Sequence, residues 1–295
     1  MISTFNNLSS SIILELKPKN KIKRKIQFSC IYYEIQALSK RLYIQTRRRP
    51  STIISGIIQP LLWLLLFGGL FQNAPVGLLT SNIRYGTFLS AGIITFTSFN
   101  GAINAGLPLM FDREFGFLNR LLISPLISRD SLLISSIFFI TTITTIQTLF
   151  IIIFSLIFYN NTFNTLTIFA ILFITCLITL SMASISICCA FILPGHIEFL
   201  AFTVIINLPM LFSSTALAPL SFMPYWLQII ASLNILTYSI ECIRYLSTAH
   251  YLYNNPVIMQ SIWFNINLSH SIYILLIVNI LSLILVKNII SYKFE

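Results

Sequence analysis

The sequence is short of charged residues, which make up only 9% of its 295 positions. A soluble globular domain carries roughly 25% charged residues, because its surface must be solvated by water. Hydrophobic residues make up 56% of this chain, and its mean hydropathy is +0.87. A fold of this length cannot cover itself with so few charges, so most of its outer face must contact lipid. The sequence therefore indicates an integral membrane protein.

Acidic residues, histidines and paired cysteines are also scarce. Eight Asp and Glu residues leave little material for general acid–base catalysis. The three histidines, His196, His250 and His270, lie in different segments, and the five cysteines form no CxxC pair, so no metal site is predicted. The G-x-x-x-x-G-K-[S/T] phosphate-binding loop is missing as well. We therefore expect no catalytic residue and no bound cofactor in this chain.

The positive charges that are present gather at the N-terminal end. Residues 1–49 hold 11 of the 18 Lys and Arg residues but only two acidic ones. A basic leader can bind nucleic acid, but this one precedes a long apolar run, which favours an anionic membrane face as its partner. Residues 1–25 lack the ordered regions of a signal peptide and are predicted to be a disordered basic tail. Membrane lipid is thus the expected partner of this region, and nucleic acid is not.

Residues 26–49 follow the tail with a helical pattern. Ile31, Ile35, Leu38 and Leu42 recur at spacings of four, three and four, and charged residues fall off that stripe. This pattern predicts an amphipathic helix that lies in the membrane interface. A helix packed on a soluble partner is the open alternative.

Residues 50–295 contain six apolar runs of a length that suits a bilayer. The sequence therefore predicts an all-α integral membrane protein with six transmembrane helices. Residues 218–270 are only moderately apolar and contain three prolines, so a short outer re-entrant or helical segment is expected before the last span. The six predicted spans are residues 51–71, 85–110, 132–159, 165–193, 198–217 and 271–286.

The orientation follows from the positive-inside rule, under which loops on the cytoplasmic side are enriched in Lys and Arg. With the N-terminus inside, the inner segments of a six-span chain carry 16 of the 18 Lys and Arg residues. The outer segments carry only Arg84 and Arg244. Both termini are therefore predicted on the cytoplasmic side or its organellar equivalent.

Two pairs of polar residues stand out within the apolar segments. Asn100 and Asn104 lie one helical turn apart in the second span, where a lipid-facing amide is costly, so they are expected to face protein or a transport path. Glu241 and Arg244 are three residues apart near the outer leaflet. They are candidates for an outer gate or for an ion pair that braces a re-entrant hairpin.

The inner connection between the second and third spans carries most of the charge found between spans. Residues 111–129 read FDREFGFLNRLLISPLISR. Phe117, Leu118, Leu121 and Leu122 share one helical face, and Pro125 ends the segment. Such a helix could seat in the groove of a soluble partner, or it could simply connect two spans. The residues alone leave both readings open.

This connection resembles that of the type 2 ATP-binding-cassette export permeases. Their pattern here is D/E-R-E-x-G-x-x-x-x-L-x-x-x-P, with a basic residue following. Two further stretches resemble the same family: Arg49-Pro50 with residues 60–68, and residues 219–244, although Ile235 stands where the family has proline. The resemblance runs from about residue 28 to the C-terminus. The matching residues of the connection are Asp112, Arg113, Glu114, Gly116, Leu121, Pro125 and Arg129.

The resemblance implies a permease subunit that forms a substrate path and is driven by a separate ATPase subunit, which binds ATP and Mg. It also implies a pair of permease copies, with a homodimer expected. The residues expected to dock the ATPase are Asp112, Arg113, Glu114, Gly116, Phe117, Leu118, Arg120, Leu121, Leu122, Pro125 and Arg129.

Other readings remain open at this point. A Phe-, Ile- and Asn-rich composition is typical of an AT-rich organelle genome, so a plastid membrane is expected, with a bacterial inner membrane as the alternative. A six-span subunit of a protein or cofactor translocase without an ATP-binding-cassette motor is the alternative function. An intramembrane enzyme would need paired histidines or a Trp-rich outer motif, which the three scattered histidines and three tryptophans do not provide.

Overall fold

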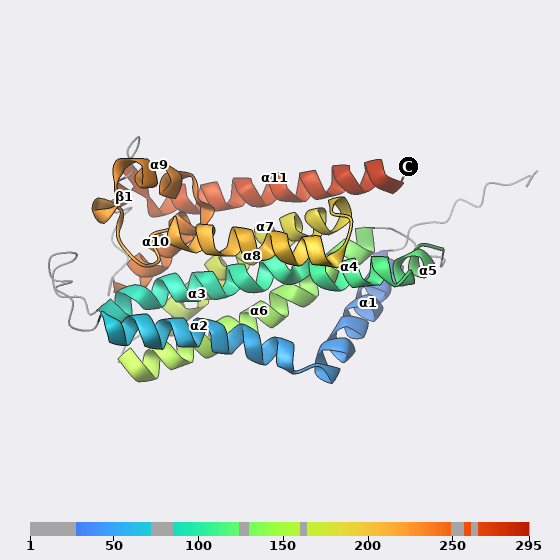
Figure 1. The fold of residues 1–295 in the computed structure, drawn as a ribbon, viewed down its shortest axis with the longest axis horizontal. Coiled ribbons are helices and arrows are strands. Elements are labelled where there is room, and N and C mark those ends of the chain that lie inside the picture. The colour runs from blue at the N-terminus through green and yellow to red at the C-terminus, as the bar shows by residue number, and fades with distance from the viewer. Residues whose placement is uncertain are drawn as a thin grey trace, which may run out of the picture.

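A computed structural model describes residues 28–71, 85–123, 130–159, 164–248, 257–260 and 265–294. Long helices run roughly along the long axis of the molecule, and the C-terminus lies at the same end as α1 and α5 (Figure 1). The predicted tail, residues 1–25, lies outside the described residues. The helices up to the middle of the chain are α1 (Phe28–Arg48), α2 (Ser51–Leu70), α3 (Tyr85–Ile103), the 3₁₀ turn η2 (Asn104–Gly106), α4 (Leu107–Glu114), α5 (Phe117–Ile123) and α6 (Asp130–Tyr159).

The second half of the chain adds two long helices, a shorter one and an irregular outer end. These elements are α7 (Thr165–Ile192), α8 (His196–Phe212), η3 (Leu220–Phe222), α9 (Tyr225–Leu233), α10 (Ile235–Thr248), β1 (Val257–Gln260), β2 (Asn265–Asn267) and α11 (Leu268–Phe294). The antiparallel pair β1–β2 is the one feature of the described chain that departs from the predicted all-α class. The mostly helical prediction is confirmed, and the two short strands were not anticipated.

Four of the predicted spans form helices long and apolar enough to cross a membrane. Among the described residues these are α2, α6, α7 and α11, and the count becomes five if the bent pair α9–α10 is one span. The other two predicted spans are helical but fall short: α8 has 17 residues, and α3 is rich in Ser, Thr and Gly. The six-span count therefore stays a prediction.

Helix α3 owes its polar composition to its place at the centre of the bundle. Seventeen of its 19 residues are buried, and it packs on α2, α6, α7 and α10. Its hydroxyl groups donate to carbonyls of the same helix, as in Thr95 to Ala91 at 3.0 Å and Thr97 to Ile93 at 2.7 Å. Small hydroxyl residues satisfied in this way permit close helix packing in a membrane protein. A helix that contacts protein on nearly every side does not need an apolar surface toward lipid.

A separate apolar cluster forms at the end of the bundle that holds α1 and α5. Buried residues of seven helices meet there, so this end has its own core. It includes Leu38 of α1, Met110 of α4, Leu118 of α5, Phe199 of α8 and Val286 of α11.

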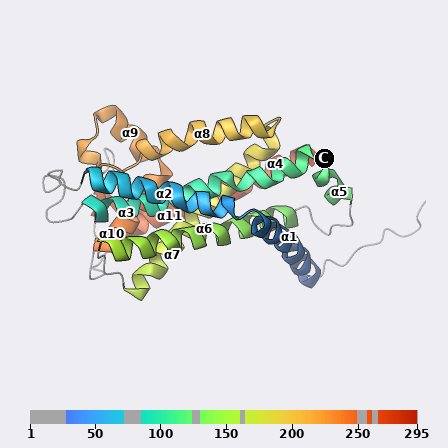
Figure 2. The ribbon, with the colours of Figure 1, turned by 60° about the horizontal axis from the view of Figure 1, so that its bottom comes forward.

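Helix α1 confirms the predicted helical pattern but packs on protein along part of its apolar stripe. Leu38 and Leu42 are buried, and α1 lies against α6. Tyr32 and Tyr33 are about two-thirds exposed. Figure 2 shows α1 leaving the bundle at an angle. Its position in a membrane interface stays a prediction.

The expected outer segment before the last span is a sharply bent helix pair. The axes of α9 and α10 differ by 85° across a break at Asn234. The Asn234 amide donates to the Met210 carbonyl at 2.9 Å, and its side-chain oxygen accepts from the backbone N–H of Leu236 at 3.0 Å. An asparagine that bonds two residues ahead stabilises a turn and starts a new helix. Ile235, which replaces the family's proline, thus starts α10 without disturbing the bend.

Candidate functional site

The inner connection is two helices rather than one. Helix α4 ends at Glu114, and Phe115 and Gly116 form a turn before α5 begins at Phe117. Gly116 has φ of +71°, a left-handed conformation that glycine adopts without strain. The shared helical face of Phe117, Leu118, Leu121 and Leu122 had suggested one short helix in this connection. The glycine breaks it, so the two halves point in different directions.

Asp112 joins α4 to α1. Its carboxylate accepts a hydrogen bond from the Arg41 guanidinium at 2.5 Å, and Arg41 also lies over the Phe117 ring at 4.8 Å. Burial raises the pKa of the Asp112 carboxyl above its usual range, although the hydrogen bond and positive charge of Arg41 oppose that shift. The pair therefore holds α1, α4 and α5 together at one point.

Arg113 caps the C-terminal end of α7. The Ala190 carbonyl lacks its usual helical donor, because the residue four positions later is Pro194, which has no N–H. Arg113 supplies that donor at 2.9 Å and also donates to the Phe191 carbonyl at 3.2 Å. Its other terminal nitrogen donates to the carbonyls of Leu193 and Pro194. A cation at a helix C-terminus is further stabilised by the helix dipole.

Glu114 performs the matching task at the start of α8. Its carboxylate accepts a hydrogen bond from the backbone N–H of His196 at 2.5 Å, and its other oxygen contacts the His196 ring Nδ1 at 2.5 Å. The backbone hydrogen bond from His196 is the largest cause that lowers the pKa of the Glu114 carboxyl below its usual value. A negative group at a helix N-terminus is favoured by the unpaired N–H groups there. Three consecutive residues thus bind three different elements.

The structure divides the remaining predicted docking residues between core and surface. Leu118 is buried and Leu121 packs on the same cluster, so they do not form an exposed ridge. Apolar exposure is instead greatest at Phe115 and Ile123, which are 80% and 85% exposed. Arg120 is exposed and Phe117 is partly so. The side chain of Leu122, and residues Pro125 and Arg129, lie outside the described part of the chain. The docking role itself stays a prediction.

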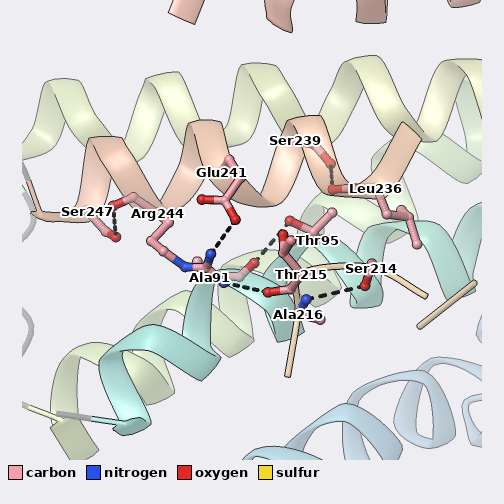
Figure 3. Close-up of polar contacts among 10 residues, drawn as sticks. All are labelled: Ala91, Thr95, Ser214, Thr215, Ala216, Leu236, Ser239, Glu241, Arg244 and Ser247. Carbon is pink, nitrogen blue, oxygen red and sulfur yellow. Dashed lines mark hydrogen bonds and ion pairs between the residues drawn. The ribbon is translucent and has the colours of Figure 1, made fainter. Parts of the chain in front are cut away.

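Glu241 and Arg244 form a buried ion pair at the opposite end of the bundle. The Arg244 guanidinium donates to the Glu241 carboxylate at 2.5 Å and to the Thr215 carbonyl at 2.7 Å, which Figure 3 shows. It also lies 3.7 Å from the centre of the Phe88 ring. Arg244 therefore links α10 to α3 and to the segment after α8. This geometry agrees with the bracing alternative, and an outer gate remains untested.

Asn100 lies at a junction of three helices, which the sequence could only suggest. Its side-chain oxygen accepts from the Asn207 amide of α8 at 3.0 Å, and its amide donates to the Gln59 oxygen of α2 at 3.4 Å. Asn104 donates to the Asn100 carbonyl at 2.8 Å, one turn back. Both asparagines also line a cavity, so helix packing and access to a polar space occur together.

That cavity, of about 380 Å³, is lined by residues of α1, α2, α3, α6 and the η2–α4 segment, and it opens on one side. Its floor is polar and buried: Asn100 is 8% exposed and Gln147 is 4% exposed. Arg49, Thr52 and Ser55 line its exposed side at the junction of α1 and α2. We call this space the α1–α2 cavity.

The sequence analysis missed three amides that build this region. Gln59, Gln147 and Asn207 were not singled out, although each is the only amide residue in its apolar helix. That isolation was the available signal, because an amide in a lipid-facing position is costly. Only the folded chain shows that all three gather around Asn100 and the α1–α2 cavity.

Two glycines make the space for Gln147. A Cβ atom at Gly56 would collide with the Gln147 amide, and one at Gly101 would collide with Thr144 and approach Gln147. We expect Gly101→Ala to destabilise the protein by about 1–3 kcal/mol, the usual cost of overpacking. The measurement is the melting temperature of purified protein. Gly69→Ala is the control, because nothing lies within 4 Å of its added atom. Equal melting temperatures for the two variants would contradict this packing.

A family model for the ABC-2 type transporter matches residues 33–247. The chain belongs to the ABC-2 type transporter family. The matched range runs from the second turn of α1 to the last turn of α10, so it holds the Asp112–Glu114 triplet, the α1–α2 cavity and the Arg244 ion pair together. The ABC-2 assignment confirms the family that the sequence motifs indicated.

Relatives from algae cover this ABC-2 chain almost completely. Proteins curated under the name "Putative transport permease ycf38" are 53% identical over 95% of this chain and 97% of the relative in Porphyra purpurea, and 52% identical over the same shares in Pyropia yezoensis. A third, from Cyanophora paradoxa, is 48% identical over 88% of this chain and 90% of its own length. These relatives are plastid-encoded. The chain is a multi-pass transporter permease subunit of a plastid or bacterial membrane.

Proposed function

We propose that this ABC-2 permease subunit forms the substrate path of an ATP-driven exporter. A separate ATPase subunit binds ATP and Mg and drives two copies of the permease. The family assignment supports this proposal, because the matched range includes the Asp112–Glu114 triplet on which the sequence resemblance rests. The main structural support for the proposed function is the exposed turn between α4 and α5.

We define the docking turn as the exposed residues Phe115, Phe117, Arg120 and Ile123. The turn projects from the end of the bundle where α1 and the C-terminus lie (Figure 1). Positive charge predicts that this end faces the ATPase compartment. Asp112, Arg113 and Glu114 bond inward to α1, α7 and α8, so their part is to hold the turn in place. The exposed apolar side chains are left to contact the partner, as buried anchors do in protein interfaces.

Removing the apolar anchors of the docking turn should release the ATPase. We expect Phe115→Ser combined with Ile123→Ser to reduce the yield of co-purified ATPase at least tenfold, because interface energy concentrates in a few large apolar side chains. The measurement is ATPase recovered per permease after affinity purification from membranes. It also separates an ATP-binding-cassette exporter from a translocase that has no such partner.

The control uses two exposed apolar residues at the opposite end of the bundle. Phe222→Ser with Ile230→Ser removes the same two residue types at positions that are 56% and 46% exposed, less than the 80% and 85% of Phe115 and Ile123. This variant should keep its ATPase. If the docking-turn variant retained the full yield while the permease level stayed normal, the docking proposal would be wrong.

The proposed orientation places both termini on the cytoplasmic or stromal side. It follows from the 16 Lys and Arg residues predicted inside against two outside. Membrane-impermeant labels should reach cysteines placed after Met1 and before Glu295 only from the inner side, and a cysteine at residue 161 only from the outer side. Labelling of the two termini from opposite sides would contradict the six-span topology.

A further inference from the structure

The α1–α2 cavity is lined by a residue with a hydrogen-bond acceptor that the protein does not satisfy. The Gln147 side-chain oxygen is buried and has no hydrogen-bond partner, while its amide nitrogen lies 3.4 Å from the Ile53 carbonyl. A buried polar atom left without a partner costs about 1–3 kcal/mol. Gly56 also lines the cavity, and its carbonyl has no helical donor four residues later, because residue 60 is proline. A ligand that fits here must therefore donate hydrogen bonds.

The charge of the cavity restricts the ligand further. Arg49 is the only charged residue among the described residues that line it, and no acidic residue is among them. Arg49 is exposed and forms no ion pair in the described chain, so its guanidinium is free to bind an anion. The lining also offers the amides of Gln59, Asn100 and Asn104, of which Asn100 is buried. These groups suit a headgroup that places hydroxyls inside the cavity and a negative charge near the cavity's opening.

The surface beside the cavity is apolar. Helix α2 contributes Ser55, Gly56 and Gln59 to the cavity, while Ile54 and Ile58 of the same helix are 52% and 49% exposed. Only 17% of the apolar stretch of α2 is buried in the protein, so its other faces are available to acyl chains. A molecule whose polar end occupies the cavity would lay any hydrocarbon tail along α2. This continuity of polar cavity and apolar helix favours a lipid over a soluble solute.

We propose that the α1–α2 cavity binds the headgroup of an anionic lipid that carries free hydroxyls, with Gln147 accepting from a hydroxyl and Arg49 facing the negative charge. The site lies within one copy of the chain. Lipid binding to this site is measured directly, so the result does not depend on the ATPase or on transport.

The test is native mass spectrometry of the purified full-length permease with added lipid. Phosphatidylglycerol carries both the negative charge and two free hydroxyls, whereas phosphatidylcholine carries neither a net charge nor hydroxyls. We expect phosphatidylglycerol to bind at least tenfold more tightly. Gln147→Leu should weaken its binding about tenfold, the equivalent of one buried hydrogen bond. Arg49→Gln should weaken it about threefold, whereas Arg48→Gln, an adjacent exposed cation outside the cavity, should not.

A second pair of variants keeps the test decisive if Gln147→Leu folds poorly. Thr52 is exposed and lines the cavity, so Thr52→Trp should fill its entrance and reduce phosphatidylglycerol binding at least tenfold. Ser51→Trp, on the exposed surface outside the lining, should bind normally. Equal binding of the two lipids, or unchanged binding in Thr52→Trp, would overturn the proposal. Full displacement of the lipid by soluble glycerol 3-phosphate would also overturn it, since the site would then recognise a solute.

Discussion

Replacing Arg244 with methionine should destabilise the protein by about 3–5 kcal/mol, the usual result of breaking a buried ion pair by removing one partner. The Arg244 and Glu241 side chains are only 10% and 13% exposed, so the variant would leave a carboxylate buried without its cation. It would also leave the Thr215 carbonyl without its donor and remove the cation from the Phe88 ring. The melting temperature of purified protein measures the effect.

A double variant separates lost charge balance from lost packing. Arg244→Met combined with Glu241→Leu removes both charges and keeps apolar volume, so it should recover much of the lost stability. Glu241→Gln alone, which keeps a hydrogen-bond acceptor for Arg244, should cost less than Arg244→Met. A double variant no more stable than Arg244→Met would show that the contacts to Thr215 and Phe88, and not the ion pair, carry the effect.

Replacing Arg113 with alanine should have the second-largest effect. One charge-assisted hydrogen bond contributes about 1.5–3 kcal/mol, and Arg113 donates to four carbonyls at the end of α7. Water can reach some of these carbonyls, so we expect a total loss of about 3 kcal/mol rather than the sum. The loss should be greatest at the Ala190 carbonyl, because Pro194 has no N–H to replace the donor that Arg113 supplies. Stability of the purified protein and its level in membranes both report this loss.

Arg120→Ala is the matched control for Arg113→Ala. Arg120 is an exposed cation seven residues further along the same connection, so its removal should change stability by less than about 0.5 kcal/mol. Arg113→Lys should recover little, since an ammonium cannot serve carbonyls in the planar geometry of a guanidinium. Equal stability of Arg113→Ala and Arg120→Ala would mean that the capping bonds contribute nothing to folding.

The sequence predicted the helices better than it predicted which of them face lipid. Long apolar runs such as α6 and α7 were placed to within a few residues, because run length and hydropathy report lipid contact directly. The pattern could not distinguish a lipid-facing helix from α3, whose neighbours are other helices. The short strands β1 and β2 gave no clear alternation of apolar and polar residues, so they were missed.

The residues of the candidate site were predicted only in part, and the orientation of their side chains was not predicted. The motif located Asp112, Arg113 and Glu114, and it gave no sign that each side chain bonds to a different element. Helical periodicity put Leu118 on an exposed ridge, since periodicity finds a face but not which side of the helix is solvated. Phe115 was not singled out at all, because its exposure depends on the turn at Gly116.

The inward bonds of the Asp112–Glu114 triplet limit how α4 can move. Successive residues of an α-helix point about 100° apart, so three of them in a row project around most of its circumference. Asp112 holds α1, Arg113 holds the end of α7, and Glu114 holds the start of α8. A twist of α4 about its own axis would have to break all three attachments at once. A displacement of the turn beyond Glu114 would therefore move α4 and its three neighbours together as one rigid body.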